Sequence, residues 1–143
     1  MADRVLVPVD GSEQSDRACD FVFEEFAEAT LVLLHVINPV EAGYSAQASI
    51  PPSASEEWYE QQKEQASEQF DEIESKAAEH GIEVERAVEV GKTTRVIVEF
   101  AEQEDIDHVV IGSHGREGVS RILLGSVAET IVRRSPVPVT VVR

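Results

Sequence analysis

The fold of this chain is decided by residues 108–134, which read HVVIGSHGREGVSRILLGSVAETIVRR. The first four residues form a short apolar run that predicts a buried strand, and the last eight have the spacing of a helix. The loop between them contains four glycines. Glycines let backbone N–H groups approach an anion without interference from a Cβ atom, and a helix N-terminus favours negative charge. These features together predict a phosphate-binding loop.

The spacing of the glycines narrows the kind of loop. Gly112, Gly115 and Gly118 recur every third residue, and Gly125-Ser126 stand at the entrance of the helix. Ser126 can cap that helix or offer its hydroxyl and N–H to a phosphate oxygen. Because no Lys precedes Ser126 and no G-x-G-x-x-G run is present, the loop is neither a Walker A motif nor a Rossmann dinucleotide motif.

Charge supports the same interpretation. From Gly112 to the C-terminus the sequence has five Arg and two acidic residues, a net of +3. Residues 1–111 hold 26 acidic residues and seven Lys or Arg, a net of −19, and the two parts sum to the −16 of the whole chain. A locally positive segment is what a polyphosphate needs when the overall field repels it. The alternative is that the glycines form a surface turn and the arginines a solvated face.

The chain resembles a known family in its motifs. The spacing Gly112-x2-Gly115-x9-Gly125-Ser126 resembles the nucleotide-binding signature of the universal stress protein family, specifically its ATP-binding branch. The resemblance covers essentially the whole chain. It is carried by residues 5–12 (VLVPVDGS), 33–36 (LLHV), 107–112 (DHVVIG), 124–129 (LGSVAE) and 136–139 (PVPV).

The resemblance implies an ATP site. In the family, the aspartate that matches Asp10 lies against the ribose and base, and the backbone at the position of Val36 lies near the adenine edge. Any Mg²⁺ or Mn²⁺ would be held mainly by phosphates and water. The residues implied to contact the nucleotide are Pro8, Val9, Asp10, Val36, Ile111, Gly112, His114, Gly115, Arg116, Gly125, Ser126 and Val127. His114 can contact a phosphate or act as a base toward water; the alternative is an exposed loop residue.

The order of elements predicts an α/β fold in a single domain, residues 1–143. Strands are expected at residues 4–9, 31–37, 82–90, 108–111 and 137–142, and helices at 15–29, 53–80, 93–104 and 127–134. This alternation predicts right-handed βαβ units and a parallel sheet. The third strand alternates apolar and charged residues, which predicts a sheet edge. The resemblance implies a five-stranded, mainly parallel, Rossmann-like sheet (adenine nucleotide alpha hydrolase-like), in the order 3-2-1-4-5 with helices on both faces.

In that order the first and fourth strands are neighbours whose helices leave toward opposite faces. Asp10 and Gly112 both end these strands, and ligands of open α/β sheets bind at such a switch point. The alternative for Asp10 is bonding to turn amides. His35, in the second strand, is interpreted as a packed core histidine rather than a catalytic base.

Residues 38–80 are predicted to form a long loop followed by a long helix. Residues 38–55 lack periodicity, which predicts a surface loop at the same edge as Asp10 that could cover a bound nucleotide. Ser53-x-x-Glu56 is a capping-box pattern that predicts the start of the long helix, ended by Gly81. Trp58 is interpreted as a packing residue rather than a base-stacking platform.

Composition bounds the class of protein. The sequence has no apolar run near the roughly 20 residues of a membrane span and no signal-peptide pattern, so we expect a cytoplasmic protein. The single cysteine, Cys19, excludes an internal disulfide and is interpreted as a small core residue. Nucleic-acid binding is disfavoured by 28 acidic residues against 12 Lys and Arg. We interpret this acidity as salt adaptation in a halophile, with simple acidic solubility as the alternative.

Three function classes remain open from the sequence. The first is an ATP-binding regulatory module in the stress response, with absent or slow hydrolysis and no dedicated catalytic residue. The second is a protein-interaction module with a vestigial nucleotide site, and the third is a nucleotide-using enzyme of the adenylyl-transfer type. A homodimer through residues 137–142 is expected, because this apolar strand lies at a sheet edge. The alternative is a monomer whose edge is shielded by Pro136 and Pro138.

Overall fold

The computed structural model describes residues 3–40, 52–113 and 125–143. Within these residues five strands form one parallel sheet: β1 (Arg4–Pro8), β2 (Thr30–Ile37), β3 (Val84–Val90), β4 (His108–Gly112) and β5 (Val139–Val142). The helices are α1 (Glu13–Glu25), α2 (Pro52–Glu79), α3 (Thr93–Gln103) and α4 (Ser126–Arg134). The strand order is β3-β2-β1-β4-β5. The α/β fold, the strand order and the edge position of β3 are thereby confirmed.

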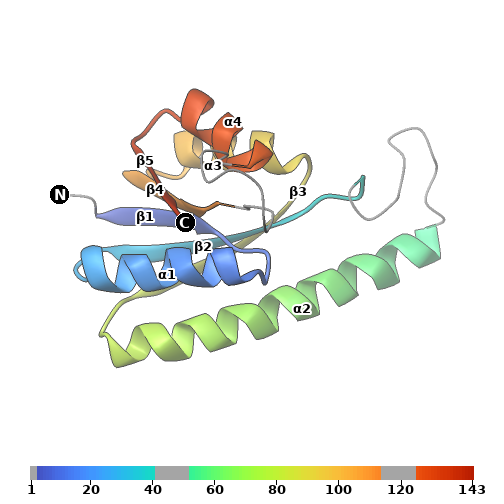
Figure 1. Cartoon of the computed structure of the whole chain (residues 1–143). Helices are drawn as coiled ribbons and strands as arrows, with labels where there is room; N and C mark the ends of the chain where they lie inside the picture. Colours follow the sequence, from blue (N-terminus) through green and yellow to red (C-terminus); the bar gives the residue numbers. More distant parts are fainter. Residues whose placement is uncertain (1–2, 41–51, 114–124) are drawn as a thin grey trace.

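The helices cover both faces of the sheet (Figure 1). α1 and α2 lie against one face, and α3 and α4 lie against the other. Side chains alternate between the two cores with the period of two that a strand imposes, so the central strands are buried on both sides. The first core contains Val5, Val7, Leu31, Leu33 and Val110, and the second contains Leu6, Val32, Leu34, Val109 and Ile111. Burial of each such side chain contributes about 1.5–3 kcal/mol.

Helix α1 begins and ends earlier than the range 15–29 predicted from its apolar residues. Ser12 is the N-cap, and its side-chain oxygen accepts from the Ser15 N–H at 3.2 Å. At the other end the Phe26 N–H donates to the Val22 carbonyl, and the Ala29 N–H donates to the Phe26 carbonyl at 3.0 Å. The chain therefore turns toward β2 after Glu25. Ala29 is buried by this turn and not by the helix, which is why the stripe overran the helix end.

Helix α2 begins at Pro52, so Ser53 lies inside its first turn and not at the N-cap that the capping-box pattern predicts. Proline is favoured at the first helical position because its missing N–H would have no partner there. The end of α2 is as predicted. Gly81 adopts a φ of 69°, and the Ile82 N–H donates to the Ala77 carbonyl at 3.0 Å. Most of the predicted loop 38–55 lies outside the described residues.

Two strands begin later than predicted. β3 begins at Val84 because Ile82 closes α2. β5 begins at Val139 because Ser135 organises a turn before it: its Oγ donates to the Val137 carbonyl at 2.7 Å and accepts from the Val137 N–H at 3.1 Å. None of the helices among the described residues has both the length and the apolar character that crossing a membrane requires.

Cys19 should be chemically inert in the folded protein. It lies on the buried face of α1 with 2% of its surface exposed, and burial raises the pKa of its thiol to about 12. Because the thiolate is the reactive form, almost none of it is present at pH 8. We expect a thiol-specific reagent to label Cys19 slowly in the native protein and rapidly in guanidinium chloride. Rapid stoichiometric labelling of the native protein would contradict this burial.

Candidate functional site

The carboxyl ends of β1 and β4 meet at the centre of the sheet. The two strands pair in parallel, with Val5 opposite His108 and Leu6 opposite Val109. The chain leaves β1 into α1 on one face and, after β4, reaches α4 on the other (Figure 1). This is the switch point at which open α/β sheets bind ligands. Asp10 and Gly112 lie there, as predicted.

The turn after β1 is held from two sides. The Val9 N–H donates to the Leu34 carbonyl of β2 at 2.9 Å, and His35 Nδ1–H donates to the Val9 carbonyl at 3.0 Å. Asp10 Oδ1 accepts from the Ser12 N–H at 3.0 Å. His35 is half-buried, and its bond to the backbone supports the interpretation as a structural histidine. Asp10 is exposed at the surface of the turn and also makes the turn bond of the alternative interpretation.

The packing of α1 against β4 leaves no room for a side chain at Gly112, which its sequence context did not suggest. A Cβ atom at this position would lie 2.3 Å from the backbone oxygen of Gln14, in the first turn of α1. Real Cβ atoms do not approach a carbonyl oxygen this closely. Close packing of β4 against α1 therefore requires glycine here, whether or not a phosphate is also bound.

The start of α4 has the form of an anion site. Gly125 is its N-cap, with φ 83° and ψ 150°, and no side chain caps the helix in the described part of the chain. The first N–H groups of a helix have no partner within it, and the helix dipole favours a negative group beside them. By contrast, α1 is capped by Ser12. The uncapped end of α4 fits a phosphate group.

The structure excludes one of the two roles considered for Ser126. It is the first residue of α4 and not its N-cap, and it is exposed. Its hydroxyl therefore does not cap the helix, which leaves the phosphate-binding role open. Val127 packs partly against the core of the α3 and α4 face.

Other predicted contact residues lie around the same edge. Pro8 ends β1 opposite Leu34, so Val36 stands two residues further along β2, at the carboxyl edge. Ile111 precedes Gly112 in β4 and is 5% exposed, so it lines the edge from within the core. His114, Gly115 and Arg116 lie outside the described residues.

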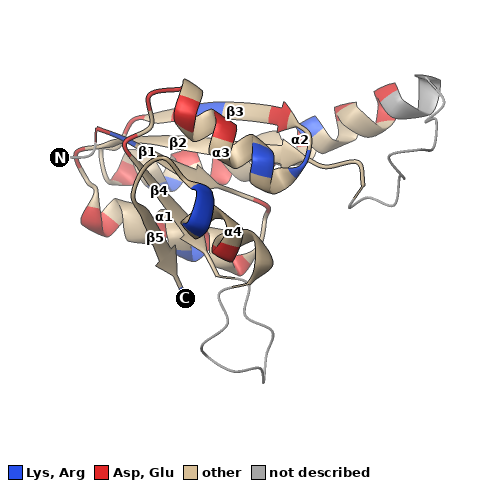
Figure 2. Cartoon of the chain, turned by 90° about the horizontal axis from the view of Figure 1, so that it is seen from above, with Lys and Arg blue, Asp and Glu red and all other residues tan. Residues whose placement is uncertain are grey.

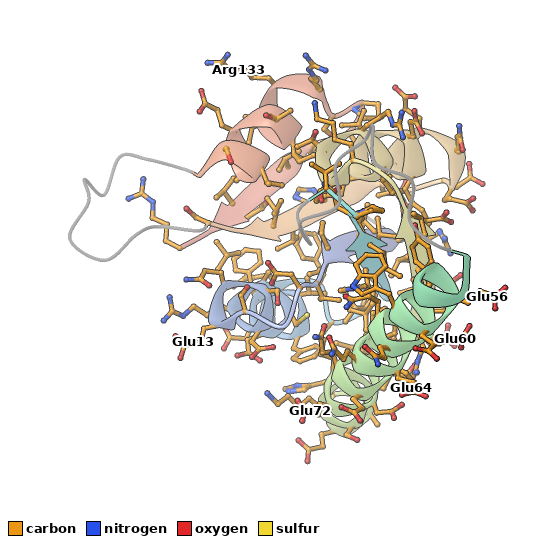
Figure 3. The ribbon with its side chains drawn as sticks, turned by 90° about the vertical axis from the view of Figure 1, so that its right-hand side faces the viewer. Glu13, Glu56, Glu60, Glu64, Glu72 and Arg133 are labelled. Carbon is orange, nitrogen blue, oxygen red and sulfur yellow. The ribbon has the colours of Figure 1, made fainter. Side chains whose placement is uncertain are left out.

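The positive segment from Gly112 to the C-terminus predicts arginines around a bound polyphosphate, and this is wrong for two of the five. Arg133 and Arg134 lie in the last turn of α4, at the opposite end of the helix from Ser126. Arg133 bonds to Glu129 at 2.8 Å and points away from the sheet (Figure 3). A helix of nine residues is about 13 Å long, so these charges are remote from its start. A count of charges along the sequence does not show at which end of the helix the arginines lie.

Two side chains near the site were not found by sequence reasoning. Ser113, after β4, is 8% exposed, and its N–H donates to the Val142 carbonyl at 2.8 Å. Gln69, from α2, lies against Gly11 in the turn after β1. Ser113 occupies a variable position of the Gly112-x2-Gly115 signature and Gln69 lies outside every motif. Their contacts join segments far apart in the chain, so no local signal marks them.

The whole chain, residues 1–143, matches the model of the universal stress protein family. The chain belongs to the universal stress protein family. The universal stress protein MJ0577 of Methanocaldococcus jannaschii is 30% identical over 100% of this chain and 96% of its own length. Its solved structure superposes with a TM-score of 0.80 over 98% of this chain and 94% of that chain.

Two further solved structures of the family contain adenine nucleotides. A universal stress protein in complex with cAMP has a TM-score of 0.70 and 26% identity, over 99% of this chain and 97% of that one. A universal stress protein family protein of Arabidopsis thaliana with AMP bound has a TM-score of 0.71 over 98% of this chain and 90% of that one. The Arabidopsis protein is only 20% identical to this chain, so its similarity shows a shared fold alone.

Proposed function

We propose that this chain is an ATP-binding regulatory module of the stress response, with absent or slow hydrolysis. The observation that carries the proposal is the uncapped start of α4, which Gly125 enters at a φ of 83°. It follows β4, and β4 lies beside β1 at the switch point of the sheet. Backbone N–H groups in this place favour a phosphate. The cAMP complex of a universal stress protein that is 26% identical to this chain supports an adenine nucleotide as the ligand.

Four of the predicted contact residues have defined roles within the proposal. Gly125, Ser126 and the amides that follow would receive the phosphates. Asp10 would lie against the ribose and base, and the backbone of Val36 would meet the adenine edge. We expect any Mg²⁺ or Mn²⁺ to be held through the phosphates and water.

The bonding of the site favours binding over chemistry. Asp10 Oδ1 and His35 Nδ1 each bond to a backbone group of the same turn. These bonds orient the turn and do not direct either group toward a reacting water, which a general base must reach within hydrogen-bond distance. An interaction module and an adenylyl-transfer enzyme remain the alternatives. We further propose that residues 1–143 act as one domain in the cytoplasm.

Thermal unfolding in molar KCl tests the proposal. At a hundredfold excess over Kd a ligand adds about 2.7 kcal/mol of stability. We therefore expect ATP to raise the melting temperature by several degrees, with ADP, AMP and cAMP compared and GTP as the control. A folded protein that no adenine nucleotide stabilises would support the vestigial-site alternative. Radiolabelled ATP then tests turnover, and rapid formation of an adenylylated product would support the enzyme.

We propose a homodimer through β5. This strand is at the edge of the sheet, and no described strand pairs with its outer side. The carbonyls of Pro138 and Val142 accept from Val109 of β4 and from Ser113 just after it. Strand alternation therefore turns the backbone groups of Val139 and Val141 outward. Antiparallel pairing of two such edges across a two-fold axis would satisfy both.

Val141→Pro should shift the protein from dimer to monomer. The substitution removes an outward-facing N–H and leaves the carbonyls that bond to β4 in place. Light scattering after size exclusion in molar KCl should give about twice 15.7 kDa for the wild type and less for the variant. Circular dichroism checks that the variant is folded. A wild-type monomer at tens of micromolar would contradict the strand-pairing proposal.

The acidic surface is the basis for a proposal of salt adaptation. Acidic residues are spread over the helices (Figure 2). The side chains of Glu56, Glu60, Glu64 and Glu72 point outward along α2 (Figure 3). Burial raises the pKa of Asp16, and nearby carboxylates raise it further against the opposing charge of Lys76. Those carboxylates are Asp20, Glu72 and Asp10. Like charges therefore repel one another close to the candidate site.

The melting temperature should rise steeply with KCl. With a net charge of −16, self-repulsion opposes folding at low salt. The Debye length falls to about 3 Å at 1 M salt, which screens this repulsion. We expect the rise to continue from about a tenth of a molar to several molar KCl. A flat melting temperature over that range would show that the acidity serves solubility alone.

A further inference from the structure

Gln69 of α2 lies against the turn that carries Asp10. A Cβ atom built on Gly11 would come within 2.7 Å of Gln69 Nε2 and 3.2 Å of its Cδ. The amide of Gln69 therefore occupies the space that a side chain at position 11 would need. Gly11 also has a φ of 80°, a conformation that glycine adopts at least cost. The glycine of the turn and the glutamine of the helix are thus matched in shape.

The amide is placed there at a cost. Gln69 Oε1 is shielded from solvent and accepts no hydrogen bond within the described residues. A buried acceptor without a donor loses its hydration and receives nothing in return. The neighbours of Gln69 on the same side of α2 are Ala66, Phe70 and Ile73, which belong to the core. The oxygen of Gln69 therefore adds nothing to stability, and what the side chain contributes is its shape against Gly11.

The helix that carries Gln69 is firmly seated on the sheet at this level. Phe70 is 2% exposed, and the guanidinium of Arg86 in β3 lies over its ring at 5.6 Å. Arg86 Nε also donates to Glu74 Oε1 at 3.0 Å, and its Nη2 bonds to Asp71. The packing of Phe70 and the ion pairs of Asp71 and Glu74, just after Gln69, therefore fix where this part of α2 lies.

We propose that Gln69 is a positioning residue, which holds the Asp10 turn in its nucleotide-binding conformation through contact with Gly11. β2 holds this turn through Leu34 and His35, and the cap of α1 holds it through Ser12. Gln69 adds a contact from α2, so the position of the turn depends on the seating of that helix. The inference rests on the proposed nucleotide site and adds to it a residue outside the family motifs.

Gln69→Ala tests the contact in two ways. Removal of one contact of ordinary strength should lower the affinity for ATP roughly three- to tenfold, measured by calorimetry in molar KCl. Amide hydrogen exchange without nucleotide should become faster at residues 11–16 and stay unchanged in α3. The matched control is Gln61→Ala, because Gln61 lies on the same helix with an exposed side chain. This control should change neither the affinity nor the exchange.

Gln69→Met separates the packing of the amide from its oxygen. Methionine fills a similar volume without a buried acceptor. We expect ATP affinity within about twofold of wild type, and a melting temperature no lower than wild type because the unpaired oxygen is gone. A methionine variant that loses as much affinity as the alanine variant would overturn the proposal, because the oxygen and not the contact would then matter.

Gly11→Ala completes a double-mutant cycle. In the wild-type protein, Gly11→Ala adds both backbone strain and a clash with Gln69, whereas in the Gln69→Ala protein it adds only the strain. The losses of ATP affinity caused by the two single substitutions should therefore not add up in the double variant. Wild-type exchange at residues 11–16 together with wild-type affinity in a folded Gln69→Ala protein would overturn the inference. If the wild type binds no nucleotide, the proposed function fails, and the exchange measurement still decides whether Gln69 positions the turn.

Discussion

Gly125→Val should lower the affinity for ATP by more than about tenfold, the equivalent of 1.4 kcal/mol. Gly125 enters α4 at a φ of 83°, which a β-branched residue adopts only with strain. The chain would escape the strain by rotating this peptide, and the N–H groups at the start of α4 would no longer point toward a common anion. Strain of this kind costs about 1–3 kcal/mol, so the melting temperature should fall as well. Calorimetry with ATP and a melting curve measure the two effects.

Gly81→Val is the matched control. Gly81 has a φ of 69°, and a Cβ atom there meets nothing within 4 Å. It lies at the end of α2, has a positive φ that also strains a β-branched residue, and has no place in the proposed site. We expect a comparable loss of stability and an unchanged affinity for ATP. Equal affinity in wild type and a folded Gly125→Val protein would remove α4 from the binding site. Gly115→Val is expected to act in the same way as Gly125→Val, at a position outside the described residues.

Gly112→Ala should be the most destabilising single methyl addition in the site. The new Cβ atom would lie 2.3 Å from the Gln14 backbone oxygen, so α1 must shift away from β4. Overpacking of this kind costs about 3 kcal/mol or more, because a helix backbone cannot rotate aside as a side chain can. In a chain of 143 residues this loss corresponds to a melting temperature lower by on the order of 10 °C.

Two comparisons isolate the cause of that loss. Gly81→Ala adds the same methyl group to open space and should cost much less. Truncation of the neighbour by Gln14→Ala should fail to rescue Gly112→Ala, since the clashing oxygen belongs to the backbone. A Gly112→Ala protein that melts within about 2 °C of wild type would show that α1 is not packed this closely.

The elements that the sequence predicted well are those whose pattern is set by local geometry. The strands around Leu6, Leu33 and Val110 were recognised because residues buried on both faces form continuous apolar runs. The helices were recognised from a period of 3.6 residues. Their ends were less accurate. The stripe of α1 continues through Phe26 to Ala29, because a turn buries the same residue types as a helix.

The candidate site was predicted in part. The placement of Asp10 and Gly112 at one edge follows from the strand order, which the family resemblance implied and the structure confirms. The grouping of the arginines did not follow, since Arg133 and Arg134 lie at the far end of α4. The caps were not predicted either: Ser12, for which no capping role was expected, caps α1, whereas Ser126, considered as a cap, lies inside α4. Whether a serine caps a helix depends on which residue first adopts helical angles, and sequence spacing alone does not specify this.

By itself the sequence determined the alternation of strands and helices, the apolar faces that pack them into two cores, and the glycine motif that marks the family. These features depend on neighbours along the chain, so they can be read from periodicity and spacing. Only the tertiary structure decided why Gly112 is glycine, and that Gln69 lies against Gly11. Both are contacts between segments distant in sequence, and both depend on how closely two helices approach the strand ends. That distance is set by the packing of the whole core.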